Sequence, residues 1–128
     1  MPTITKADIV AASEGMLHKD LFVVLTTPAN GMGPVMDNLG PHLEYQQKIE
    51  RDGIMFGAGP FWLDDETTWN GEGMVIIRAQ NLAHAREIAA NDPMHASGAR
   101  TFTVRPWLLN EGSYTVTMTY SNGKIAVR

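Results

Sequence analysis

Two short segments of this chain, Leu21–Leu25 and Met74–Ile77, are apolar at every position. They form the centres of two predicted strands, Leu21–Thr27 and Met74–Ala79, because runs rich in Val and Ile favour extended backbone. A strand with one face in water would alternate between apolar and polar residues, and these two do not. The chain must therefore fold around two strands that are covered on both faces.

The elements around these two strands complete a regular order. Apolar residues at helical spacing predict two helices, with Gly53 ending the first and Asn81 capping the second. Two more strands are predicted, one irregular at its glycines and one with Pro106 at an edge or bulge. The resulting β-α-β-β-α-β order is the ferredoxin-like pattern of an α+β fold. The helices are predicted over residues 39–52 and 82–90, and the strands over residues 54–63 and 101–109.

The two ends of the chain lie outside this pattern. A capping box that begins at Thr5 opens a predicted helix through about Leu17. Residues 113–128 predict a β-hairpin, because strict apolar–Thr alternation is followed by Asn122-Gly123, which is typical of a type I′ turn. The segment 28–34 is rich in Gly and Pro and predicts a loop.

Both helices of a ferredoxin-like unit cover the same face of the sheet, so the other face needs a second cover. A second copy of the chain is the simplest cover and predicts a homodimer or a higher oligomer. The C-terminal hairpin could instead act as the lid or extend the dimer contact. We expect a single domain over residues 1–128, with a core of about residues 20–110.

Composition excludes several classes of partner. The net charge is −4 and the ten basic residues are scattered, which argues against nucleic acid. The sequence has no cysteine, so disulfides, thiolate catalysis and cysteine-based zinc sites are excluded. We find no signal peptide and no apolar run near the roughly 20 residues that a membrane span needs. We therefore expect a soluble, cytoplasmic protein with no membrane partner.

His42 is the main candidate for chemistry. It lies on the inward stripe of its predicted helix, with Leu39, Leu43 and Gln46. An imidazole can accept and donate a proton near neutral pH, and Asp92, in the turn after the next helix, could orient it as a general acid/base pair. Alternatively, His42 is a hydrogen-bonded core histidine, and Asp92 is a turn residue before a proline.

Several other residues are candidates for binding a substrate. Gly57-Ala-Gly-Pro60 lacks the features of a phosphate loop, and its missing side chains could leave room for a ligand. Aromatic side chains at this density could line an apolar pocket, although they are more often core or interface. His95 could line the same pocket or, less favourably, join His42 and Asp92 in a metal site; we expect no metal. The predicted substrate-binding residues are Phe56, Gly59, Phe61, Trp62, Trp69 and His95.

An ordered set of short motifs supports a family resemblance. Pro41-His-Leu43, Gly57-Ala-Gly-Pro-Phe61, Asn91-Asp-Pro-Met94 and Arg105-Pro-Trp107 follow one another between roughly Leu21 and Leu109. Together they resemble the YCII-related family. The chain departs from the short family pattern by its N-terminal helix, its Trp69 loop and its C-terminal hairpin.

The resemblance implies a dimeric α+β barrel, similar to muconolactone isomerases and related small enzymes. It also implies that a His and an Asp share a cleft, at the positions of His42 and Asp92. One branch of the family eliminates chloride from chlorinated hydroxyquinols. We therefore expect a cofactor-free enzyme that performs elimination, isomerisation or lactone chemistry on a small ring compound. The alternatives are a non-catalytic protein for small-ligand binding or oligomerisation, or a monooxygenase of similar barrel fold that uses haem or O₂.

Overall fold

The computed structural model describes residues 2–128, which divide into two compact units. The core unit is Asp20–Leu108. The terminal unit combines residues 2–19 and 109–128. Each unit is described by itself below.

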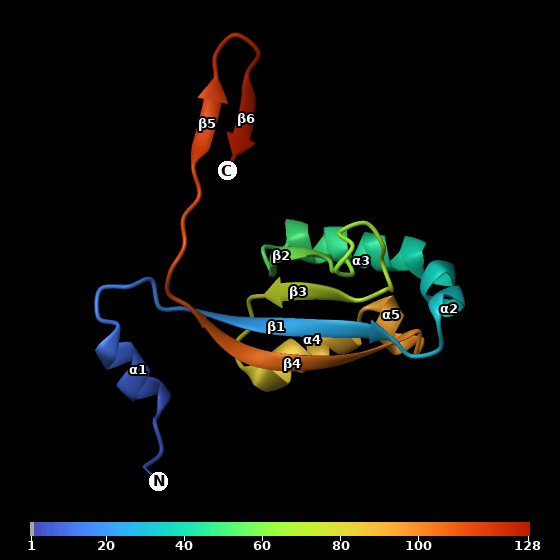
Figure 1. Ribbon diagram of the computed structural model, residues 1–128, viewed down its shortest axis with the longest axis horizontal. Helices are drawn as coiled ribbons and strands as arrows, with labels where there is room; N and C mark the ends of the chain where they lie inside the picture. Colours follow the sequence, from blue (N-terminus) through green and yellow to red (C-terminus); the bar gives the residue numbers. More distant parts are fainter. Residues whose placement is uncertain (1) are drawn as a thin grey trace. The chain divides into compact units, whose positions relative to one another are not determined.

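The core unit is built on one four-stranded antiparallel sheet (Figure 1). Its strands are β1 (Lys19–Pro28), β2 (Met55–Pro60), β3 (Gly73–Ile77) and β4 (Arg100–Leu109), in the order β2-β3-β1-β4. The two apolar strands are central, as predicted, and Pro106 lies in an edge strand, where its missing N–H is tolerated. The α+β, ferredoxin-like prediction is confirmed, and this open sheet is not a closed barrel.

The two long helices agree with their predicted ranges. Helix α3 (Leu39–Arg51) ends before Gly53, whose φ of 74° is the left-handed conformation that glycine adopts most readily. Helix α4 (Leu82–Ala90) begins where the side chain of Asn81 accepts a hydrogen bond of 2.9 Å from the N–H of His84. Both ends are therefore determined by local sequence.

Two short helices were not predicted. Helix α2 (Met32–Asp37) occupies part of the expected loop, because Gly31 turns the chain at a φ of 72° and Val35 is completely buried. Helix α5 (Pro93–Ala96) follows Asp92, whose side chain caps it by accepting from the N–H of Met94. The loop prediction for residues 28–34 was therefore wrong over its second half.

The hydrophobic core lies between the sheet and helices α3 and α4. The strands contribute Phe22, Val24 and Ile77 to it, and the helices contribute Ile49, Ala85, Ile88 and Ala89. The alternate residues of β1 belong to the other face, where Val23 is half-buried and Leu25 is 38% exposed. That second face is apolar but only partly covered by the core unit.

Strand β2 carries the predicted irregularity. Its pairing with β3 shifts between Met55 and Gly57, which leaves one extra residue at Phe56. The strand ends at Pro60 rather than at residue 63. The bulge prediction is confirmed, and beyond the bulge the strand consists of small residues and Pro60.

The terminal unit contains one helix and one hairpin. Helix α1 (Lys6–Ala12) begins with the predicted capping box and ends five residues before the predicted Leu17. Strands β5 (Val116–Thr119) and β6 (Lys124–Val127) form the predicted hairpin. Their loop has four residues and only Gly123 in it has a positive φ, so the type I′ prediction was wrong. No helix among residues 2–128 is long and apolar enough to cross a membrane.

Candidate active site

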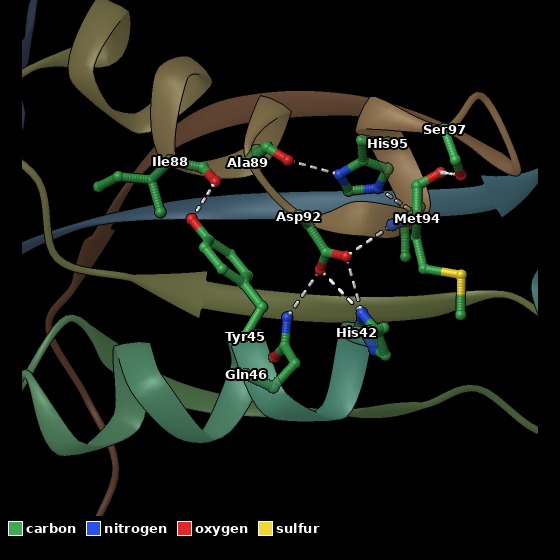
Figure 2. Close-up of polar contacts among 10 residues, drawn as sticks. His42, Tyr45, Gln46, Ile88, Ala89, Asp92, Met94, His95 and Ser97 are labelled. Atoms are coloured by element: carbon green, nitrogen blue, oxygen red, sulfur yellow. Dashed lines mark hydrogen bonds and ion pairs between the residues drawn. The ribbon is translucent and has the colours of Figure 1, made fainter. Parts of the chain in front are cut away.

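His42 and Asp92, which are fifty positions apart in the sequence, meet in the core unit (Figure 2). Nδ1 of His42 lies 2.9 and 2.8 Å from the two carboxylate oxygens of Asp92. The amide of Gln46, one turn further along α3, donates to the same carboxylate at 3.0 Å. The N–H of Met94 donates to it at 2.9 Å. The carboxylate thus accepts from three groups that come from two helices.

This environment keeps Asp92 ionised. The residue is only 3% exposed, and burial alone would raise the pKa of its carboxyl. The hydrogen bonds from His42, Met94 and Gln46, together with the electrostatic attraction of His42, outweigh burial and bring the pKa of the Asp92 carboxyl below its ordinary value. Because an ionised carboxylate only accepts hydrogen bonds, Nδ1 of His42 must carry a proton and donate it. Nε2 is therefore the nitrogen left to exchange protons.

A cavity of about 480 Å³ adjoins His42. Helix α3 forms one side of it, and strands β2 and β3 and the loop between them form the other. The side chain of His42 is 14% exposed. Leu43, which was predicted to face the interior, lines this cavity instead. Other lining residues are Leu39, Gln46, Glu50, Ala58, Gly59, Trp62, Trp69, Glu72 and Arg100.

The predicted substrate-binding residues divide between this cavity and other places. Gly59, Trp62 and Trp69 line it. Phe56, at the bulge, is 43% exposed and its ring lies 5.4 Å below the guanidinium of Arg78. Phe61 borders a different cavity. The bulge leaves Phe56 as an extra residue in β2, and Phe61 follows the end of that strand.

His95 lies behind Asp92 rather than at the cavity beside His42. Its Nδ1 is 2.7 Å from the carbonyl oxygen of Ala89, to which it must donate, and its Nε2 is 2.8 Å from the hydroxyl of Thr26. Burial lowers the pKa of His95, so it is neutral and Nε2 accepts from Thr26. Both ring nitrogens are occupied. Among residues 2–128, no three His, Asp or Glu side chains form a metal-binding group.

Sequence reasoning missed the roles of Tyr45 and Arg100. The hydroxyl of Tyr45 donates to the carbonyl oxygen of Ile88 at 2.6 Å and so ties α3 to α4 (Figure 2). Burial, and then the charge of Asp92, raise the pKa of Tyr45. Arg100 begins strand β4 and is only 7% exposed. Helical spacing could have identified Tyr45, whereas an arginine at the start of a strand gives no signal of burial.

Known proteins are similar to this chain in sequence or in fold. The uncharacterised protein YjpA of Bacillus subtilis (strain 168) is 29% identical over 75 residues, which cover 59% of this chain and 81% of YjpA. A solved structure with a similar fold is 5-chloro-2-hydroxyhydroquinone dehydrochlorinase (TftG) from Burkholderia phenoliruptrix AC1100, in complex with 2,5-dihydroxybenzoquinone. Its TM-score is 0.56 at 22% identity, and the match covers 68% of this chain and 92% of TftG.

The predicted family resemblance is confirmed by the match to a family model. The model of the YCII-related domain matches residues 21–108, which is more than half of the chain and includes every residue of the site described above. The terminal helix and the hairpin lie outside the match. The chain belongs to the YCII-related family.

Proposed function

We propose that the protein is a cofactor-free enzyme in which His42 moves a proton on a small ring compound. The observation that carries this proposal is the hydrogen-bonded His42–Asp92 pair beside a cavity of about 480 Å³. A single oriented imidazole and an apolar pocket suffice for general acid/base chemistry. The dehydrochlorinase activity named for TftG, whose fold is similar, supports chemistry of this class.

Each member of the pair has a distinct role in the proposal. Asp92 is a positioning residue. It accepts a hydrogen bond from Nδ1–H of His42 and does not itself line the cavity beside His42. Nε2 of His42 accepts a proton from a hydroxyl or carbon of the substrate. In an elimination, the electron pair released by that proton forms a new π bond, and the leaving group departs with its own bonding pair. In an isomerisation, Nε2 returns the proton at another atom of the ring.

The test is the turnover of His42→Asn. The asparagine amide can replace Nδ1–H as a donor to Asp92 but has nothing in place of Nε2, so we expect kcat to fall by about 10²–10⁴-fold without loss of fold. Chloride release from 5-chloro-2-hydroxyhydroquinone is the first assay, followed by lactone and isomerase substrates. His84→Asn, a histidine on α4 that does not line this cavity, is the matched control. A kcat of His42→Asn equal to that of the wild type would contradict the proposal.

We also propose that the protein associates with itself. The hairpin places Val116, Met118, Ile125 and Val127 on one face, because cross-strand partners share a face, and all four are exposed. An isolated two-stranded hairpin is marginally stable in water, so this face needs a cover. The exposed Leu25 on the second face of the core sheet adds a further apolar surface. A second copy of the chain can cover the hairpin face and this sheet face.

We also propose a cytoplasmic location, because a chain without cysteine suits a reducing compartment.

A further inference from the structure

We propose that Arg100 forms an anion-binding subsite in the His42 cavity, which holds an ionised oxygen of the ring substrate. The inference rests on the proposed function and adds a substrate class to it: ring compounds that carry a phenolate, enolate or carboxylate oxygen. The subsite is separate from the proton carrier, because Arg100 begins β4 whereas His42 lies on α3. Both residues line the same cavity.

Arg100 is a buried cation whose side chain forms no hydrogen bond or ion pair with residues 2–128. Its side chain lines the cavity, and its Nε is buried with no hydrogen bond. No carboxylate among residues 2–128 forms an ion pair with it. Proteins rarely bury an arginine in this state, because an uncompensated charge and an unsatisfied donor are both unfavourable. A ligand anion in the cavity would compensate the charge of the guanidinium.

The carboxylate whose charge acts on Arg100 already accepts hydrogen bonds from other groups. Burial lowers the pKa of Arg100, and the charge of Asp92 partly opposes this effect. The carboxylate of Asp92, however, accepts from His42, Gln46 and the N–H of Met94. Asp92 therefore stabilises the charge of Arg100 from a distance and leaves the donors of its guanidinium free for another acceptor.

Trp69 supports the guanidinium from the loop between β2 and β3. The guanidinium carbon of Arg100 lies 5.8 Å from the centre of the Trp69 ring. The indole N–H of Trp69 donates to the carbonyl oxygen of Glu72 at 2.9 Å, which fixes the ring. Trp69 also packs against a buried cluster of Val35, Met94 and Ala99. Arg100 is therefore held in place rather than left to move into solvent.

The charges around the cavity favour a single anion beside Arg100. Glu50 and Glu72 also line the cavity, but neither forms an ion pair with Arg100. Their charges favour an anionic group held beside Arg100 over one held elsewhere in the cavity. The planar, always charged guanidinium suits a localised oxygen anion and would orient the ring so that His42 acts on a neighbouring atom.

The test of the subsite is the dissociation constant of 2,5-dihydroxybenzoquinone, an acidic ring compound. It is measured by calorimetry on the full chain. For Arg100→Gln we expect the dissociation constant to rise by about 10- to 100-fold, since hydrogen bonds to charged groups have that effect. Arg105→Gln, at an exposed position of the same strand, is the matched control and should bind as the wild type does. Arg100→Lys keeps the charge and should retain part of the affinity, which guards against a variant that simply fails to fold.

Two further ligands identify the group that binds. The neutral 2,5-dimethoxybenzoquinone should bind weakly and equally to the wild type and Arg100→Gln. Selective loss of 2,5-dihydroxybenzoate affinity in Arg100→Gln would assign the subsite to a carboxylate, and selective loss of dihydroxyquinone affinity would assign it to an enolate. Equal affinities of wild type and Arg100→Gln for both anions would overturn the inference, as would no binding by the wild type. The two proposals are tested by separate measurements: turnover of His42→Asn tests proton transfer, and ligand affinity of Arg100→Gln tests the subsite.

Discussion

The core unit and the terminal unit differ in how far they bury their apolar side chains. In the core unit, Leu21, Val35 and Ile77 are almost completely buried, and polar groups such as Asp92 have several partners. In the terminal unit, the hairpin exposes its aliphatic face, and Tyr120 is 93% exposed. The difference teaches that the core unit buries a hydrophobic core of its own and carries the candidate site, whereas the aliphatic face of the hairpin has no cover among residues 2–128.

The largest effect should come from the orientation of His42 in the core unit. In Asp92→Asn, the amide can offer an N–H to Nδ1 and stabilise the wrong tautomer, so kcat should fall by about 10²–10⁴-fold. A purely structural role would instead lower stability and leave kcat of the folded fraction unchanged. We would measure kcat and KM separately, with unfolding by urea as a check on the folded fraction.

Asp37→Asn, at an exposed position at the end of α2, is the control for this prediction. It should change neither kcat nor stability. A rise in KM with kcat unchanged, or equal losses of kcat in both variants, would contradict the positioning role of Asp92.

A pair of isoleucine truncations compares packing in the two units directly. Ile77→Ala should reduce the free energy of unfolding by about 2–5 kcal/mol, because Ile77 is 1% exposed in the core. Ile125→Ala, in the exposed hairpin, should change it by less than about 0.5 kcal/mol at protein concentrations where the chain is monomeric. Denaturant unfolding followed by circular dichroism measures both. Equal effects would mean that the hairpin is packed within the single chain.

Self-association should depend on the hairpin face. Replacing Met118 and Ile125 together by threonine should weaken the dimer by at least about tenfold, since each buried aliphatic side chain contributes about 1.5–3 kcal/mol. Sedimentation velocity across a concentration series measures this change. The control is Thr117→Ser on the opposite face of the hairpin. A wild type that is monomeric at every concentration would refute the prediction.

The smallest expected effect is the pH dependence contributed by His95. Its folded-state pKa lies below its ordinary value of 6.5, so the unfolded chain takes up a proton first as the pH falls. Its contribution to stability is therefore complete above pH 6.5 and is lost as the pH falls towards the folded-state pKa. His95→Gln should flatten this slope by up to about 1.4 kcal/mol per pH unit, measured by urea unfolding at a series of pH values. The same slope in His84→Gln and His95→Gln would contradict this assignment.

Local signals predicted more of this molecule than long-range ones. The Asn81 cap, the Gly53 terminus and the β2 bulge each depend on a few adjacent residues, and all three were predicted. The α2 helix depends on the burial of Val35. The burial of Arg100 depends on Trp69, which is 31 positions away. Neither contact leaves a local pattern in the sequence. Helical spacing predicts that the His42 side chain points inward but not how far it lies from Asp92. The contact between the two was therefore only one of two alternatives until the family resemblance was considered.

The three donors around Asp92 have a consequence for how this site can change. Gln46 and the N–H of Met94 donate to the carboxylate independently of His42, so we expect both bonds to survive when the side chain at position 42 is shortened. The acceptor is therefore anchored independently of the imidazole that it orients. If the proposed function holds, free imidazole added to His42→Gly should bind between the Asp92 carboxylate and the cavity and restore part of the lost turnover.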